Sequence, residues 1–156
     1  MTQMSKSAMS WKKSDVGTLM TYASLRFSGD CLEPHRLTDI LHTAPTIAYR
    51  KGEVYKRTRG HEVRGRTGLW AVSSKGRVDS PDLNDHLEHL LSVIFSGSGQ
   101  NRLTPLHAFI HENGLVADVP CFWHGAHGAR PPVIRDDIRE RLARIPAEIE
   151  EDFDTD

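Results

Sequence analysis

The sequence predicts an α+β protein in which helices pack mainly on one face of a single sheet. We expect this sheet to be mostly antiparallel or mixed, in a ferredoxin-like arrangement with an extra βα unit. The 156 residues are enough for one ordinary domain with its own core. Segments with apolar residues at every second position, typical of strands, are interspersed with segments of three-to-four-residue periodicity, typical of helices. Such a succession favours one sheet covered by helices.

The first strand is predicted over residues 20–28, because apolar and polar residues alternate there before the turn residues Ser28-Gly29-Asp30. We expect residues 1–17, which are polar and aperiodic, to form a disordered arm. The single domain is then expected over 18–153, followed by an acidic tail at 154–156.

A short amphipathic helix is predicted to begin at Pro34, because Leu37, Ile40 and Leu41 have helical spacing. Pro45 ends this segment. Beyond it we expect a strand near residues 53–57, an exposed loop over 58–67 and a clearer strand over 69–73. Trp70, in the middle of that last strand, is predicted to be a core residue, with Ser73 as a polar partner.

The next helix carries the strongest pattern in the chain. Ser80 is the expected N-cap, Pro81 the first helical residue, and Gly97-Ser98-Gly99 the end. Its apolar positions form one stripe: Leu83, Leu87, Leu90, Leu91 and Ile94. We expect this stripe to pack on the sheet, whereas His86 and His89 lie off it and are expected at the surface.

Residues 103–114 fit two interpretations. Alternation at Leu106, Ala108 and Ile110 favours a strand, whereas Thr104 as N-cap, Pro105 and a terminal Gly114 favour a helix. We choose the helix because it explains both ends of the segment.

Three further elements complete the prediction. A strand is expected over 115–123, with Pro120 indicating an edge or a bulge, and a helix over 136–144. A last edge strand is expected where Ile149, Glu151 and Phe153 alternate.

Several short motifs resemble a known family. They are Phe27-Ser28-Gly29-Asp30, Leu32-x-Pro34, Pro45-Thr46, Lys51-Gly52-Glu53, Gly68-x-Trp70-x-x-Ser73 and His86-Leu87-x-x-Leu90-Leu91. Together they resemble the bacterial family called domain of unknown function 4279, over about residues 22–153. The basic insert at 56–66 and the His/Gly loop after Trp123 depart from its pattern. The resemblance implies a bacterial or phage-borne cytoplasmic protein and provides no activity.

Composition excludes several classes of protein. The formal net charge of −1 provides no overall attraction to nucleic acid or to an anionic membrane. Two cysteines do not make a disulfide framework, and no apolar stretch approaches the ~20 residues of a membrane span. Because the N-terminal residues have no apolar core typical of a signal peptide, we expect a cytoplasmic protein without a membrane partner.

The charge is nevertheless distributed unevenly. Residues 50–77 hold nine Lys/Arg and two acids, whereas residues 148–156 hold six acids and no base. The candidate ligand or partner surface consists of Arg50, Lys51, Lys56, Arg57, Arg59, Arg64 and Arg66. Interleaved with Tyr49, Tyr55 and Trp70, these residues suit phosphates and stacked bases. The alternative, which we favour, is a solvated segment partly neutralised by the acidic C-terminus.

A metal site is the second candidate. Cys121-x-x-His124-x-x-His127 has the spacing of zinc ligands, and on the helix interpretation His107 and His111 are neighbours that could add to it. On the strand interpretation those two residues stand ~13 Å apart and cannot share a metal ion. We favour exposed histidines on a Gly-rich loop, because the pattern matches no standard site. We therefore assign no cofactor, with zinc as the alternative.

Catalytic signatures are weak throughout, since the sequence has no H-E-x-x-H, no G-x-S-x-G and no phosphate-binding Gly-rich loop. We therefore expect a non-enzymatic module that binds another protein, in a setting of bacterial stress, immunity or phage conflict. Binding of nucleic acid or a nucleotide through the basic segment is one alternative. A metal-dependent hydrolase built on the histidines is the other.

Overall fold

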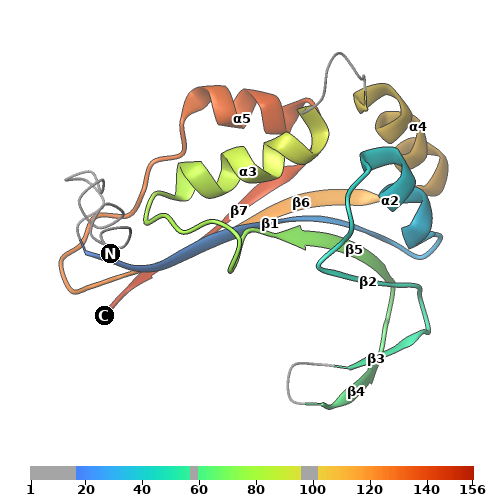
Figure 1. The fold of residues 1–156 in the computed structure, drawn as a ribbon, viewed down its shortest axis with the longest axis horizontal. Coiled ribbons are helices and arrows are strands. Elements are labelled where there is room, and N and C mark those ends of the chain that lie inside the picture. The colour runs from blue at the N-terminus through green and yellow to red at the C-terminus, as the bar shows by residue number, and fades with distance from the viewer. Residues whose placement is uncertain (1–16, 57–59, 96–101) are drawn as a thin grey trace, which may run out of the picture.

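The computed structural model describes residues 17–56, 60–95 and 102–156. Figure 1 shows the elements in chain order. They are β1 (Thr18–Gly29), α2 (Pro34–Leu41), β2 (Ile47–Tyr49), β3 (Val54–Lys56), β4 (Glu62–Arg64), β5 (Gly68–Ser73), α3 (Leu83–Phe95), α4 (Leu103–Asn113), β6 (Val116–Gly125), α5 (Asp136–Ala143) and β7 (Glu148–Thr155). Five strands form the main sheet, and β3 and β4 form a separate two-stranded hairpin.

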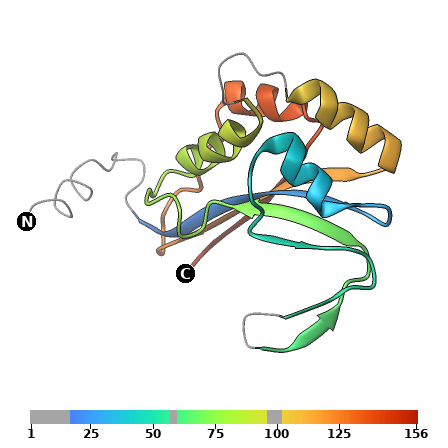
Figure 2. The same ribbon diagram turned by 45° about the vertical axis from the view of Figure 1, so that its right-hand side comes forward.

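Helices α2, α3, α4 and α5 all lie on one side of the main sheet (Figures 1 and 2), which confirms the predicted layer arrangement. The hairpin leaves the sheet on the opposite side. One face of the sheet is therefore buried under helices, and none of the helices in the described residues lies over the other face, called the helix-free face below.

The strand order is β2-β5-β1-β6-β7, in which β6 and β7 are parallel and the other neighbours are antiparallel. Strand β5 lies between β1 and β2, and strand β1 lies between β5 and β6. Each intervening strand is antiparallel to both of its neighbours, as in split β-α-β units. The sheet is thus mixed and mostly antiparallel, as predicted. The α5–β7 unit adds an edge strand next to β6. The ferredoxin-like arrangement itself stays a prediction.

The core lies between this sheet and the helices. On β1 the residues Ala23, Leu25 and Phe27 are 0–1% exposed. The leucine-rich stripe of α3 lies against them, because Leu83, Leu87, Leu90, Leu91 and Ile94 are all buried in the same cluster. The predicted packing of this helix on the sheet is confirmed. Each such side chain contributes about 1.5–3 kcal/mol through removal from water.

Two helix starts differ from the prediction. Helix α3 begins at Leu83, and Asp82 acts as its cap because Oδ1 accepts a hydrogen bond from the N–H of Asn84 at 2.9 Å. Ser80 was wrongly predicted as the N-cap; its hydroxyl oxygen accepts from the N–H of Asp82 at 3.1 Å. Helix α4 begins at Leu103, before the predicted N-cap Thr104.

The end of α4 supports the helical interpretation of residues 103–114. Gly114 has φ 59°, in the left-handed region that glycine adopts without strain, and its N–H donates to the carbonyl of Ile110. The predicted end of α4 at Gly114 is confirmed.

The prediction that Pro120 marks an edge or a bulge is wrong, because the register of β1 with β6 is the same on both sides of it. Pro120 lies in β6, which pairs with β1 on one side and β7 on the other. The pairing of β1 with β6 is recorded at Ala23–Cys121 and at Arg26–Asp118 but not between them. Proline has no N–H to donate to that ladder, and this accounts for the interruption.

The predicted loop over 58–67 contains a strand. Residues Glu62–Arg64 pair antiparallel with Val54–Lys56, so part of the predicted loop belongs to a two-stranded sheet. Short strands of three residues have no clear alternation, which is why the pattern did not reveal β2 and β4.

Some predictions fall outside the described residues: residues 1–16 of the arm, Arg57, Arg59 and the glycines at 97 and 99. Gly17 is described, and its carbonyl accepts a hydrogen bond from the N–H of Ala126 at 2.7 Å. The strand β7 runs to Thr155, within the segment assigned to the acidic tail. None of the helices in the described part of the chain combines the length and apolarity required to cross a bilayer.

Candidate functional site

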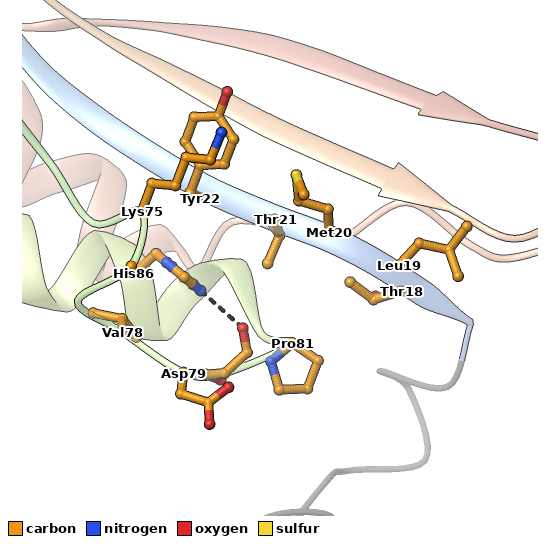
Figure 3. A pocket seen from close by; sticks show the side chains of 12 residues that line it. Thr18, Leu19, Met20, Thr21, Tyr22, Lys75, Val78, Asp79, Pro81 and His86 are labelled. Atoms are coloured by element: carbon orange, nitrogen blue, oxygen red, sulfur yellow. Dashed lines mark hydrogen bonds between the residues drawn. The ribbon is translucent and has the colours of Figure 1, made fainter. Parts of the chain in front are cut away.

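A pocket of about 270 Å³ lies beside the first half of β1. One wall consists of residues 18–22 of β1, and the other of the segment between β5 and α3, including Val78, Asp79 and Pro81 (Figure 3). His86 of α3 also lines it. The pocket is thus formed where β1 extends past the end of its neighbour β5.

Among the described strands, none pairs with one edge of this part of β1. Strand β5 pairs only with residues 24–29 of β1, whereas β6 pairs along nearly the whole strand. Just past the end of β5, the carbonyl of Ala23 accepts from the N–H of Ser74, and the N–H of Ala23 donates to Oγ of Ser74, both at 2.9 Å. Because main-chain groups alternate in direction, the N–H and C=O of Thr21 point to this same side. No main-chain group within residues 17–56, 60–95 and 102–156 hydrogen-bonds to the N–H or C=O of Thr21 on this side.

The strand is irregular at the same place. The register between β1 and β6 shifts between Thr18 and Met20, so that Leu19 is an extra residue in a β-bulge. The side chains of Leu19 and Met20 are 56% and 48% exposed, although both are large and apolar. An unpaired strand edge with exposed apolar side chains is a surface to which another extended chain can add.

A buried hydrogen-bond network fixes the opposite wall. Nδ1 of His86 lies 2.7 Å from Oγ of Ser74, and Nε2 lies 2.8 Å from the carbonyl oxygen of Ser80. Because a carbonyl only accepts, Nε2 carries the proton, and Nδ1 accepts from the Ser74 hydroxyl. Burial lowers the pKa of His86, which favours this neutral form. The network ties β1, the segment 74–80 and α3 together.

The prediction that His86 lies at the surface is wrong, since it is 2% exposed, and Ser74 is fully buried. Sequence reasoning missed this pair because His86 is off the leucine stripe, and a polar residue there is ordinarily solvated. The serine at the end of β5 indicates nothing by itself. Although serine and histidine are adjacent, the fully buried hydroxyl already has both partners, so the pair is a structural link.

The helix-free face of the sheet continues from this pocket. The ring of Tyr22 stacks on that of Phe122 with centroids 5.0 Å apart, and Nζ of Lys75 lies 5.0 Å from the Tyr22 centroid. Farther along β1, Arg26 forms two hydrogen bonds of 2.8 Å with the carboxylate of Asp118. This hydrogen bonding raises the pKa of Arg26.

Strand β7 makes one edge of this face acidic. Glu150 lies beside Pro120, and Asp152 beside Phe122, in the parallel register with β6. Oε1 of Glu150 also lies 3.7 Å from Nη2 of Arg26. A polyanion lying across this sheet would therefore meet carboxylates, which repel it.

The described Lys and Arg residues of the candidate surface are exposed, as expected. Several are already engaged: Arg50 pairs with Glu33 at 2.8 Å, Lys51 with Asp30 at 3.0 Å, and Arg64 donates to the carbonyl of Gly52 at 2.6 Å. Lys56 and Arg66 are exposed too. The structure therefore distributes the predicted ligand surface along a hairpin and partly neutralises it with nearby acids.

The aromatic residues named with this segment separate into two groups. Tyr49 and Tyr55 stack on each other with centroids 4.1 Å apart, joining β2 to the hairpin. Trp70 is fully buried, which confirms its core role, but its indole N–H donates to Oγ1 of Thr38 at 3.1 Å rather than to Ser73.

The predicted metal ligands do not gather. Cys121 and His124 are three residues apart in β6, so their side chains point to opposite faces. Cys121 is buried in the core, and burial raises the pKa of its thiol to about 12. His124 instead contacts Oδ1 of Asp156 at 2.7 Å, and His127 lies 3.4 Å from the Asp156 carbonyl oxygen.

His107 and His111 are on one face of α4, as the helix interpretation predicts, and line a shallow pocket there. Nε2 of His107 donates to the carbonyl of Arg144 at 2.5 Å. Nowhere in the described part of the chain do three His, Cys, Asp or Glu residues come together in a way that could hold a metal ion.

A comparison with family models matches residues 19–156 to the family described as Domain of unknown function (DUF4279). This chain belongs to that family. The DUF4279 match includes every pocket-lining residue except Thr18, together with helices α2 to α5, and it confirms the family resemblance found in the sequence. The DUF4279 description assigns no activity. Comparisons with curated proteins and with solved structures find no match.

Proposed function

We propose that this DUF4279 chain is a protein-binding module that takes an extended segment of a partner alongside residues 18–22 of β1. The observation that carries the proposal is the unpaired main-chain edge at Thr21, facing a pocket beyond the end of β5. A partner strand placed there would continue the line of β5 and hydrogen-bond to main-chain groups that β5 does not reach. Strand addition of this kind is a recurring mode of peptide recognition.

The walls of the pocket indicate what kind of segment fits. Leu19, Met20, Val78 and Pro81 provide apolar contacts, whereas Lys75 and Asp79 provide one charge of each sign. We therefore infer an extended peptide with small or apolar side chains and little net charge. Specificity would come from side chains at alternate positions, because neighbouring residues of a strand point to opposite faces.

The other two functions expected from the sequence have less support. A nucleic-acid strand on the helix-free face would meet Glu150 and Asp152, and part of the basic hairpin is paired with acids. The histidines of the hydrolase hypothesis do not converge, as described above. We therefore favour a protein partner, sought in the bacterial cytoplasm.

The test uses linear peptides selected against the full-length protein from a random displayed library. A selected peptide is then titrated calorimetrically against Thr21→Pro and Thr21→Val. Proline removes the N–H directed at the free edge and also fixes φ of residue 21. Valine keeps the N–H and controls for loss of the hydroxyl, which donates to the carbonyl of Phe122 at 2.7 Å.

We expect Thr21→Val to bind like the wild type and Thr21→Pro to bind at least tenfold more weakly, equivalent to about 1.4 kcal/mol. Equal affinity of both variants would show that the peptide does not use this edge. Failure to select any linear peptide contradicts the proposal as well. A homodimer dissociated by Thr21→Pro would replace the partner with a second copy of the chain.

A further inference from the structure

A second pocket, of about 290 Å³, lies between the C-terminal end of α2, the end of β5 and the middle of α3. Its charged and titratable lining residues are all basic: Arg77, Arg102, His42 and His89. Hydroxyl groups of serine and threonine complete the polar lining, and none of the described residues lining it is Asp or Glu. Since the whole chain has a net charge of −1, this one-sided lining is a local feature.

The basic side chains come from separate, anchored positions. Arg77 follows β5 in a turn where its N–H donates to the carbonyl of Ser74 at 2.9 Å. Arg102 precedes α4, and its Nη1 donates to the carbonyl of Val93 at 2.8 Å. His89 belongs to α3. These residues therefore reach the pocket lining from separate segments of the chain.

His42 is fixed by the end of α2. It has φ 50°, and it is the single non-glycine residue with positive φ in the described part of the chain. Its N–H donates to the carbonyl of Thr38, which ends the helix and directs the residue into the pocket lining. A non-glycine residue in this conformation is uncommon and costs about 1 kcal/mol or more.

We propose that this pocket binds the phosphate group of a small phosphorylated molecule. Arginine guanidinium groups donate forked hydrogen bonds to phosphate, and imidazole and hydroxyl groups can donate to its remaining oxygens. A phosphate has three terminal oxygens that accept from several directions, which suits donors arranged around a cavity, whereas a carboxylate presents two oxygens in one plane. The volume is close to the lower end of small-molecule clefts, which favours a compact ligand.

This proposal does not rest on the proposed peptide-binding function, because its residues are separate from the β1 edge. The two are distinguished by the same variant set. Thr21→Pro is expected to retain phosphate binding, and a variant of the phosphate pocket is expected to retain peptide binding.

Inorganic phosphate is titrated into the full-length protein. Binding is measured by calorimetry and by the shift in melting temperature. Malonate and chloride at equal ionic strength serve as the carboxylate and non-specific comparisons. The variant is Arg77→Gln, and the matched control is Arg66→Gln, which removes an exposed arginine outside the pocket. Circular dichroism and the melting temperature without added anion show whether each variant is folded.

We expect saturable phosphate binding that Arg77→Gln weakens at least tenfold, while Arg66→Gln changes it less than twofold. If phosphate and chloride shift the melting temperature equally, or if Arg77→Gln binds phosphate like the wild type, the proposal is wrong. Binding of malonate without binding of phosphate would also overturn it, since the site would then be one for carboxylates. Should Arg77→Gln not fold, His89→Gln takes its place with the same expectations.

Discussion

Replacing Ser74 by alanine tests the buried network that shapes the β1 pocket. The hydroxyl is fully buried, accepts from the N–H of Ala23 at 2.9 Å and donates to Nδ1 of His86 across 2.7 Å. Alanine leaves both of these groups without that partner. A buried polar group without a partner costs about 1–3 kcal/mol, so we expect Ser74→Ala to lower the free energy of unfolding by about 2–4 kcal/mol.

The neighbouring Ser73→Ala is the matched control. Its Oγ accepts from the N–H of Lys75 in an exposed contact, so we expect a change below about 1 kcal/mol. Urea unfolding followed by tryptophan fluorescence measures both variants. With a slope of about 2 kcal/mol per molar urea, the Ser74→Ala midpoint should fall by roughly 1–2 M. If the two variants unfold within 0.5 kcal/mol of each other, as a rough limit of such measurements, the network does not stabilise the fold as argued.

Three more predictions concern stability and reactivity. Burial lowers the pKa of His86 below its unfolded value of 6.5, so the unfolded state takes up a proton first as the pH falls. Stability should therefore decrease below about pH 6.5, and this group contributes at most about 1.4 kcal/mol per pH unit to the decrease. Urea unfolding at several pH values should show a shallower decrease for His86→Asn than for the wild type. Leu87→Ala should lower the free energy of unfolding by about 2–5 kcal/mol in the same assay, because Leu87 is fully buried. Leu19→Ala, at an exposed position, should lower it by less than about 1 kcal/mol. Similar losses of stability in the two variants would contradict the packing of α3 on the sheet. Native protein should react with a thiol reagent at the exposed Cys31 and not at Cys121, because burial raises the pKa of the Cys121 thiol to about 12. Mass spectrometry measures the rate of modification at each cysteine. Equal rates at the two thiols would contradict the burial of Cys121.

The long elements were predictable because their residues repeat the period of the structure. Residues 83–94 form the leucine stripe of α3, and the alternation at 20–28 defines β1. Gly114 ended α4 as predicted because a local left-handed turn depends on one residue and not on the rest of the fold.

The partners of polar residues were not predictable in the same way. Trp70 was correctly placed in the core, but its indole bonds Thr38 on α2 rather than the nearby Ser73. Cys121 and His124 have a ligand-like spacing in the sequence, yet a strand places residues three apart on opposite faces. Pro120, expected at an edge or a bulge, lies in an interior strand that tolerates one interrupted pairing without a change of register.

The sequence by itself determined the fold class, the family, the leucine-rich face of α3 and the exposure of the described basic residues, since hydrophobic periodicity and charge act locally along the chain. Tertiary structure decided which strand edge is left unpaired at Thr21, the burial of His86 against Ser74, and the gathering of basic side chains around the second pocket. These features depend on how strands of unequal length end beside one another, and on distances between residues far apart in the chain. No local pattern contains that information.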